Sequence, residues 1–187
     1  MTKRLIDILL SGAALIVLAI PIVLVALAVK LTSRGPMLYW SERIGRGNRS
    51  FRMPKFRSMR VDTPVVATHL LDSPERWLTP IGSYLRRSSL DELPQLWSIF
   101  VGDMSIVGPR PALFNQHDLI ELRTQRGVHK LRPGLTGWAQ VNGRDEIPIP
   151  EKVAYDAWYL EHQSLALDLR IMWRTAAQVV RSEGVSH

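Results

Sequence analysis

The sequence predicts a helix-rich α+β protein in which an N-terminal re-entrant membrane helix, a small β-hairpin and amphipathic interfacial helices surround one compact domain. Residues 8–29 carry no charge and are mostly Leu, Ile, Val and Ala, a run long enough for a helix in a bilayer. Short apolar segments flank the Gly-containing residues 45–48, as in a hairpin. Later segments have helical spacing of apolar residues and are bounded by Gly and Pro.

The composition limits the classes of protein to which the chain can belong. Its 187 residues suffice for one domain, and contents of 46% hydrophobic and 22% charged residues argue against disorder. The net charge of +7 and the pI of about 10.2 predict an anionic partner: a phosphorylated substrate, lipid headgroups or nucleic acid. The absence of cysteine excludes disulfide, thiolate and zinc–cysteine chemistry.

The flanks of the apolar run predict how it meets the membrane. Lys3 and Arg4 precede the run, and Lys30 and Arg34 follow it. Because positively charged residues tend to stay on the cytoplasmic side, cations at both ends favour a helix that enters the bilayer and returns to the same face. Pro21 lies inside the run and should break the helix there.

Two other interpretations of the run remain open. A straight span would place its two ends on opposite sides, and a signal peptide would be removed after the Ala-Leu-Ala of residues 26–28. The run is longer than a usual signal-peptide core, which favours the re-entrant helix. We therefore divide the chain into a re-entrant membrane helix, residues 1–34, and a domain at the cytoplasmic face of the membrane, residues 35–187.

The rest of the chain contains one hairpin and several helices. Pro and Gly make residues 107–111 a rigid turn that presents Arg110. The last helix has a wide apolar face bordered by arginines, so it either lies in a membrane interface or packs on the core. The expected strands are residues 37–40 and 51–53, and the expected helices are residues 81–87, 91–100, 112–125, 150–161 and 166–181.

Two adjacent carboxylates, Asp91 and Glu92, are the first candidates for a chemical role. Pro94 is tolerated only in the first turn of a helix, and Ser89 and Glu92 have the spacing of a capping box. Asp91 should therefore lie at a helix N-terminus, where the dipole favours an anionic carboxylate and a nearby phosphate. With Arg86 close by, Asp91 is a candidate nucleophile toward phosphorus. An ordinary N-cap with a surface ion pair is the alternative.

Four ordered motifs resemble those of a known family, the bacterial sugar transferases, also called monotopic phosphoglycosyl transferases. The resemblance extends over nearly the whole chain. Two positions depart from the family pattern: Pro54 replaces an aromatic residue, and Ile20 replaces the Ser that commonly precedes the proline of the membrane helix. The motifs are KFRSM at residues 55–59, RRSSLDELPQL at 86–96, GDMS with VGPRP at 102–111, and RPGLTGWAQVNGR at 132–144.

This resemblance implies a reaction. A sugar 1-phosphate would move from a UDP-sugar to polyprenyl phosphate, giving polyprenyl diphosphate-sugar and UMP. The mechanism would be ping-pong, with a phospho-sugar formed on Asp91 and with Glu92 assisting beside Mg²⁺, as a metal ligand or as a proton handler. Asp91 and Glu92 are thus the expected catalytic residues and the expected metal ligands, and Mg²⁺ is the expected cofactor, since it prefers hard oxygen ligands and bridges to substrate phosphates.

Five basic residues are the expected substrate contacts. Arginine binds phosphate through paired charged hydrogen bonds, and Arg86 and Arg110 match family motif positions. For Lys55, Arg57 and Arg144 a structural or lipid-facing role is an open alternative. Asp156 and Asp168 also match family positions, and we expect both to be structural.

The resemblance also implies a location and partners. The protein would bind membrane lipids at the cytoplasmic face of the bacterial inner membrane and catalyse the first membrane step of a glycoconjugate or exopolysaccharide pathway. The donor sugar and the oligomeric state, including a homo-oligomer, are open. A nucleic-acid binder is disfavoured, because the arginines lie on Gly and Pro turns beside carboxylates. A non-catalytic membrane scaffold is disfavoured by the intact carboxylate pair.

Overall fold

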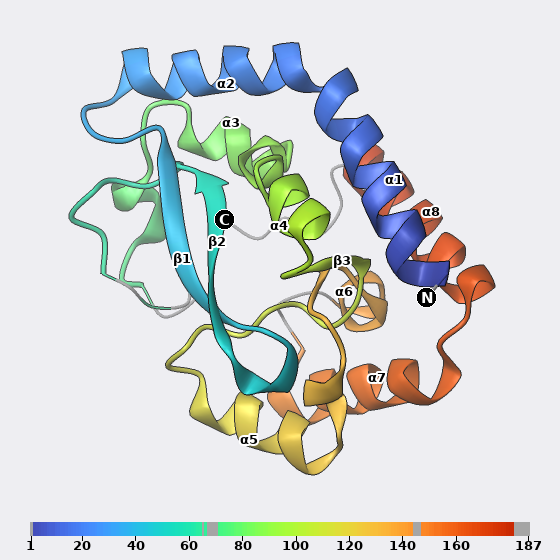
Figure 1. Ribbon diagram of the computed structural model, residues 1–187. Helices are drawn as coiled ribbons and strands as arrows, with labels where there is room; N and C mark the ends of the chain where they lie inside the picture. Colours follow the sequence, from blue (N-terminus) through green and yellow to red (C-terminus); the bar gives the residue numbers. More distant parts are fainter. Residues whose placement is uncertain (1, 65, 67–70, 144–146, 182–187) are drawn as a thin grey trace.

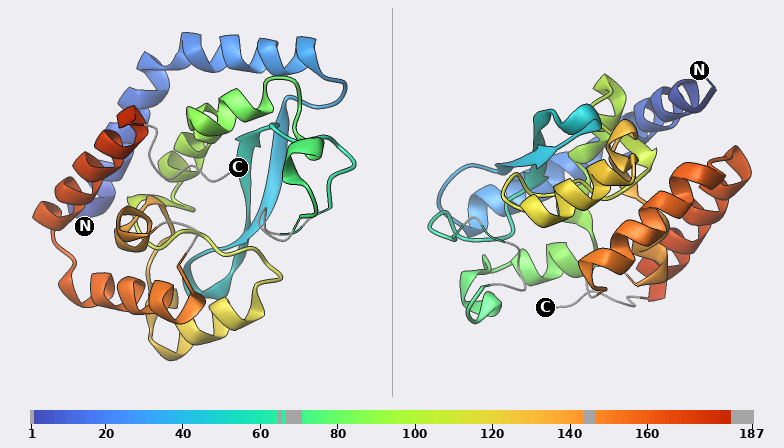
Figure 2. Two further views of the ribbon diagram at one scale, coloured as in Figure 1. Left: turned by 180° about the vertical axis from the view of Figure 1, so that it is seen from behind. Right: turned by 90° about the horizontal axis from the view of Figure 1, so that it is seen from below.

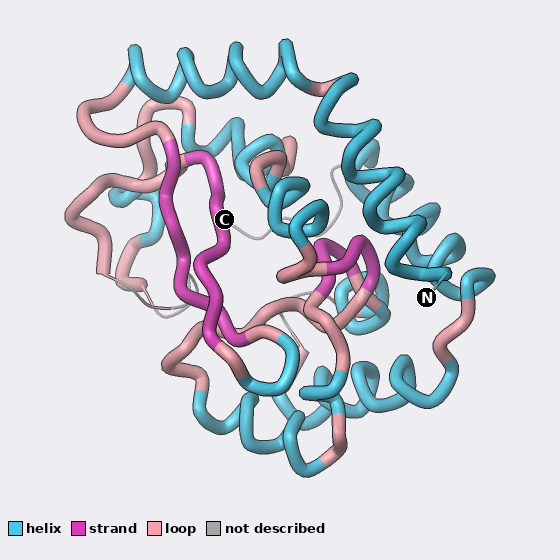
Figure 3. The backbone as a smooth tube through the Cα atoms, viewed as in Figure 1, coloured by secondary structure: helices cyan, strands magenta, loops and turns pink. Residues whose placement is uncertain are grey.

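The computed structural model describes residues 2–64, 66, 71–143 and 147–181. They form a helix-rich α+β fold, as expected, with two small sheets where a single hairpin was expected (Figures 1 and 3). Strands β1 (Leu38–Ile44) and β2 (Ser50–Phe56) pair antiparallel to form the hairpin, which is longer than the sequence indicated. Strands β3 (Ser105–Val107) and β4 (Gly134–Thr136) pair in parallel.

The helices lie around these sheets, close to where the sequence places them. The segment 112–125 becomes helical only at residue 117, because residues 113–116 form a turn. Residues 132–144 were expected to form a loop with one short strand; the strand is β4, and a short helix at residues 138–142 was not expected. The helices are α3 (Gly82–Arg87), α4 (Gln95–Val101), α5 (His117–Gln125), α6 (Trp138–Asn142), α7 (Ile149–His162) and α8 (Leu165–Arg181), with 3-10 turns η1 (Arg46–Asn48), η3 (Pro74–Trp77), η4 (Leu90–Glu92) and η5 (Val128–Lys130).

The N-terminal apolar run forms two helices, α1 (Thr2–Val17) and α2 (Ala19–Thr32), bent by 63° (Figure 1). The break falls at Leu18, three residues before the proline at which it was expected. Pro21 instead lies in the first turn of α2, where its missing N–H is tolerated. If α1 and α2 formed one unbroken helix, the Pro21 ring would clash with the carbonyl of Val17, four residues earlier. No single described helix is both long and apolar enough to cross a membrane, whereas α1 and α2 together have the length and composition of a broken span or a re-entrant loop.

Backbone hydrogen bonds continue on both sides of this break. The Leu18 N–H donates to the Ala14 carbonyl, and the Ile22 N–H donates to the Leu18 carbonyl, each at 2.8 Å. The Ser11 hydroxyl does not reach the break, because it donates to the Asp7 carbonyl at 2.6 Å.

The first turns of α1 are bonded to the rest of the protein through charged side chains. Lys3 forms an ion pair with Asp168 of α8. Arg4 donates to two carbonyls in the last turn of α4, at 2.6 and 2.7 Å. Asp7 is buried and accepts the Ile106 N–H of β3 at 3.0 Å. The cations interpreted as topology signals therefore also fix α1 to the domain, although the division at residue 34 remains a prediction.

Apolar side chains pack in several clusters between these elements. One cluster joins α4 to β2 through Met53 and Ile99. Another surrounds α6, which lies in the angle between α7 and α8, as Figure 2 shows from behind. Further large apolar side chains of α4 and α8 remain exposed, and the interfacial role considered for the last helix, α8, stays a prediction. Those on α4 and α8 are Trp97, Phe100, Val101, Leu165, Leu169, Trp173 and Val179.

The Arg4 contacts generate a prediction about stability. Arg4→Gln removes two charge-assisted hydrogen bonds that satisfy the last carbonyls of α4, so we expect the protein to lose about 1–3 kcal/mol of stability. Thermal unfolding in detergent measures the loss. Lys30→Gln is the control, since its 3.4 Å bond to the Gly35 carbonyl is exposed and should contribute little. Equal melting temperatures for Arg4→Gln and the native protein would contradict the prediction.

Candidate active site

Asp91 and Glu92 lie in the 3-10 turn η4, between α3 and α4. The predicted capping box is absent: Ser89 has a left-handed φ of 55°, and its side chain makes no capping hydrogen bond. Because this conformation kinks the chain, residues 90–92 form a separate short turn and Pro94 becomes the N-cap of α4. Asp91 therefore precedes the α-helix instead of lying in its first turn.

Glu92 is held by two cations. Its Oε1 accepts hydrogen bonds from Lys55 Nζ of β2 at 2.9 Å and from Arg110 Nη2 at 3.3 Å. Burial by itself raises the pKa of Glu92, but the charges of Lys55 and Arg110 and their hydrogen bonds outweigh burial and lower the pKa to about 2. Glu92 is therefore ionised throughout the physiological range.

Asp91 has the opposite behaviour. Asp91 is 8% exposed, and its burial is the largest effect and raises its pKa. The charge of Lys55 lowers the pKa, the negative charge of Glu92 raises it, and the charges of Arg86 and Arg110 lower it. The result is a pKa of about 6. Burial thus outweighs the expected helix-start effect. Asp91 is still mostly ionised at pH 7. No hydrogen bond to its carboxylate comes from the residues that the structure describes, so it is the less restrained of the two.

The structure brings three of the expected basic residues, Lys55, Arg86 and Arg110, around the carboxylate pair. Arg57 is used elsewhere: it is 5% exposed and donates to the Pro36 carbonyl and to the carbonyl and hydroxyl of Ser33. These bonds favour the structural alternative for Arg57, whose substrate role remains a prediction. Arg144 lies outside the described residues.

Arg110 stands on a turn whose carbonyls are held by separate elements. The sequence predicts the rigidity of this turn from its prolines, but not its partners Arg123 and Arg43. Arg123 could have been suspected, since it lies four residues after Leu119 on the buried face of α5. The pairs are Gly134 N–H to Pro109 O (2.9 Å), Arg123 Nη1 to Arg110 O (2.8 Å), Arg43 Nη1 to Pro111 O (3.1 Å) and Ile44 N–H to Ala112 O (3.0 Å).

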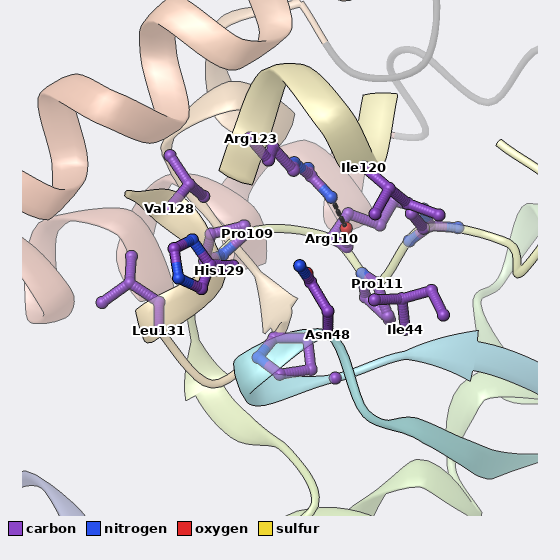
Figure 4. Close-up of a pocket in the computed structure, with 13 residues that line it drawn as sticks. Ile44, Asn48, Pro109, Arg110, Pro111, Ile120, Arg123, Val128, His129 and Leu131 are labelled. Atoms are coloured by element: carbon purple, nitrogen blue, oxygen red, sulfur yellow. Dashed lines mark hydrogen bonds between the residues drawn. The ribbon is translucent and has the colours of Figure 1, made fainter. Parts of the chain in front are cut away.

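Two hollows flank the tip of the hairpin. A narrow one of about 30 Å³ lies between the hairpin and the Arg110 turn (Figure 4). A wider one of about 520 Å³ is lined by Arg46, Arg49 and Arg132. Asp91 and Glu92 line neither of these hollows, so charge and burial, and not concavity, identify the candidate site.

The donor set around η4 fits a magnesium ion shared with a phosphate. Mg²⁺ is usually bound by one or two carboxylates together with substrate phosphates and water. Asp91 and Glu92 supply two adjacent carboxylates, and the described residues contain no cluster of three acidic or histidine side chains that could form a site by itself. A metal here would therefore depend on the substrate for part of its coordination.

Comparison with known proteins places the chain in a family. A sequence model of the family described as "Bacterial sugar transferase" matches residues 1–182. The chain belongs to the bacterial sugar transferase family. The chain is 44% identical over 95% of its length to the UDP-glucose:undecaprenyl-phosphate glucose-1-phosphate transferase of Xanthomonas campestris pv. campestris, of which it covers 38%.

Two shorter relatives match along most of their length. The uncharacterized sugar transferase EpsL of Bacillus subtilis is 37% identical over 98% of this chain and 89% of the relative. The exopolysaccharide production protein ExoY of Rhizobium meliloti is 36% identical over 98% of this chain and 88% of the relative. The sugar transferase thus spans less than half of the Xanthomonas relative and most of these two.

The raised pKa of Asp91 generates a prediction about stability and pH. Well below pH 4 Asp91 is protonated in both folded and unfolded protein. As the pH rises to about 6, the unfolded chain loses this proton first, so the folded state loses stability. Asp91→Asn should therefore be more stable than the native protein at pH 7–8, by about 1–3 kcal/mol, and most of this difference should be lost at pH 4.

Thermal unfolding of the two proteins at pH 4, 6 and 8 measures this difference. Asp72→Asn is the control, since Asp72 is exposed and its neutralisation should change little at any of these pH values. A native protein as stable as Asp91→Asn at pH 8 would mean that the Asp91 carboxylate is well solvated.

Proposed function

We propose that this sugar transferase moves a sugar 1-phosphate from a UDP-sugar to polyprenyl phosphate through a covalent phospho-sugar on Asp91. The observation that carries the proposal is the contrast within the carboxylate pair. Glu92 is held by Lys55 and Arg110, whereas Asp91 is buried, accepts no hydrogen bond from the described residues and has a pKa of about 6. The names of the Xanthomonas and Escherichia coli relatives, both UDP-glucose:undecaprenyl-phosphate glucose-1-phosphate transferases, support the substrate classes.

The first half-reaction transfers the phospho-sugar to the enzyme. An Asp91 carboxylate oxygen bonds to the β-phosphorus of the donor, and the bond from that phosphorus to the bridging oxygen breaks. The bridging oxygen leaves with UMP, so the sugar 1-phosphate remains as an acyl phosphate. Burial favours this step, because a carboxylate with little solvation and no hydrogen bond from the described residues has few interactions to lose before it attacks.

The second half-reaction restores the carboxylate. An oxygen of polyprenyl phosphate attacks the same phosphorus, and the bond to Asp91 breaks. The basic residues stabilise the phosphates in both halves: Arg110 and Lys55 lie within bonding distance of Glu92, and Arg86 is close enough to lower the pKa of Asp91. A bound Mg²⁺, held by Asp91 and Glu92, would neutralise phosphate charge.

The bent helix pair supports a location for this chemistry. Polyprenyl phosphate keeps its tail in the bilayer and its head at the surface, whereas the nucleotide sugar is soluble. A re-entrant α1–α2 pair would hold the site at headgroup depth on the cytoplasmic face, in an exopolysaccharide or glycoconjugate pathway. Exposed apolar side chains along both helices support this arrangement, including Leu9, Ile16, Val23, Leu27 and Leu31.

The nucleophile is tested with donor alone. Incubation of the protein with a UDP-sugar and Mg²⁺, without acceptor, should give a phospho-sugar adduct on Asp91 that mass spectrometry detects, together with one equivalent of UMP. UDP-glucose is the first donor to test, because relatives carry it in their names. Asp91→Asn should lose UMP release by roughly 10³-fold or more.

Asp72→Asn controls for the loss of an exposed carboxylate and should keep full activity. Normal turnover by Asp91→Asn, or an adduct on another residue, would refute the nucleophile. A folded native protein that releases no UMP from any of several UDP-sugars would favour the scaffold alternative.

The re-entrant arrangement is tested by labelling. The chain has no cysteine, so single cysteines can be placed at Thr2 and at Ser33, at the two ends of the helix pair. In inner-membrane vesicles of known orientation, an impermeant thiol reagent should label both from the cytoplasmic side. Labelling of the two positions from opposite sides would show that the pair spans the membrane.

A further inference from the structure

We propose that Arg123 and Asp156 are positioning residues that hold Arg110 in place for the donor diphosphate. This inference rests on the proposed function, because it assigns a task to residues behind the same site. Neither side chain contacts the carboxylate pair in the structure. The pair contacts Arg110 at its backbone carbonyl, whereas Glu92 is contacted by the Arg110 side chain.

The two residues form a buried ion pair between α5 and α7. Asp156 is 1% exposed and Arg123 is 8% exposed. Arg123 donates to Asp156 Oδ2 from Nε at 3.0 Å and from Nη2 at 2.6 Å. Its remaining nitrogen, Nη1, donates to the Arg110 carbonyl at 2.8 Å, the bond drawn as a dashed line in Figure 4. One guanidinium thus connects a buried carboxylate to the backbone of Arg110.

The Arg110 turn requires such support because no regular element contains it. Arg110 lies between Pro109 and Pro111, after the end of β3, and its guanidinium must reach Glu92 in η4. Rotation about the Arg110 Cα–C bond would change the angle between its carbonyl and its side chain. A hydrogen bond to that carbonyl from a buried group with fixed geometry restricts the rotation.

The chemistry of the pair favours this role over plain stabilisation. A buried ion pair carries a large desolvation cost, and apolar residues of similar volume often stabilise a fold as well or better. What apolar residues cannot supply is a donor aimed at the Arg110 carbonyl. Lysine cannot supply the same arrangement either, because only the planar guanidinium offers donors on two separate edges.

The test is a double-mutant cycle on donor kinetics. Arg123→Lys keeps the positive charge opposite Asp156 but loses the guanidinium that bonds to Asp156 and to the Arg110 carbonyl at once. We therefore expect kcat/KM for the UDP-sugar to fall about 10–100-fold, as for a displaced contact residue. KM for polyprenyl phosphate should stay within about twofold of the native value. In an Arg110→Gln background the same substitution should change kcat/KM less than about twofold, because the residue that it positions is gone.

Additive effects, meaning an equal fall in both backgrounds, would overturn the inference, because a structural role does not depend on the Arg110 side chain. Asp156→Asn is the second variant, and it keeps an oxygen to which Arg123 can bond. It should lower kcat/KM for the UDP-sugar less than Arg123→Lys does, and this fall should also disappear in the Arg110→Gln background. An equal fall in kcat/KM in both backgrounds would again overturn the proposal. Asp156→Asn therefore decides the question if Arg123→Lys does not fold.

Arg46→Gln is the matched control. It removes another arginine-to-carbonyl bond, from Arg46 Nε to the Lys130 carbonyl at 2.9 Å, away from the Arg110 turn. We expect Arg46→Gln to leave kcat/KM unchanged in the native protein and in the Arg110→Gln background. If Arg46→Gln lowered kcat/KM in the native protein but not in the Arg110→Gln background, the effect could not be assigned to Arg123. A native protein without UMP release would refute the proposed function itself, whereas an active native protein with an additive cycle refutes only the positioning role.

Discussion

The contact on which the rest of the site depends is the pair of cations at a single oxygen, Glu92 Oε1. Lys55 reaches it from the hairpin and Arg110 from the turn after β3, so segments far apart in the sequence meet at the 3-10 turn between α3 and α4. Because both cations are directed to Glu92, its neighbour Asp91 stays free of hydrogen bonds from the described residues. Two adjacent carboxylates thereby acquire different pKa values, which is how one short turn can supply both an attacking group and a charged partner.

The same region shows how closely α1 and α4 are joined. The carboxylate pair precedes the first turn of α4, and Arg4 of α1 bonds to the carbonyls of its last turn. Asp7 adds a bond to β3, the strand that leads into the Arg110 turn. The first turn of α4 thus follows the candidate site, and its last turn is bonded to α1. The α1–α2 pair is therefore part of the framework of the candidate site as well as a candidate membrane anchor.

Local patterns in the sequence were sufficient for the hairpin, most helix ends and the carboxylate pair, because Gly, Pro and apolar spacing act within a few residues. The position of the bend was missed for a local reason, because Pro21 acts on the turn before it and the break falls at Leu18. Elsewhere the patterns failed where distant contacts decide, since the ionisation of Asp91 is set by burial that no motif reveals. Arg123 was missed for the same reason, since its partners Asp156 and Arg110 come from other segments of the chain.

The wide hollow at the hairpin tip has a consequence for inhibitor discovery. It is lined by Gly102, which follows the last turn of α4, whereas Asp91 and Glu92 precede the first turn and do not line it. The Arg4 guanidinium lies close to Gly102 as well. A compound lodged in this hollow would therefore lie beside the end of α4 to which α1 is attached, and a screen directed only at the carboxylate pair would overlook it.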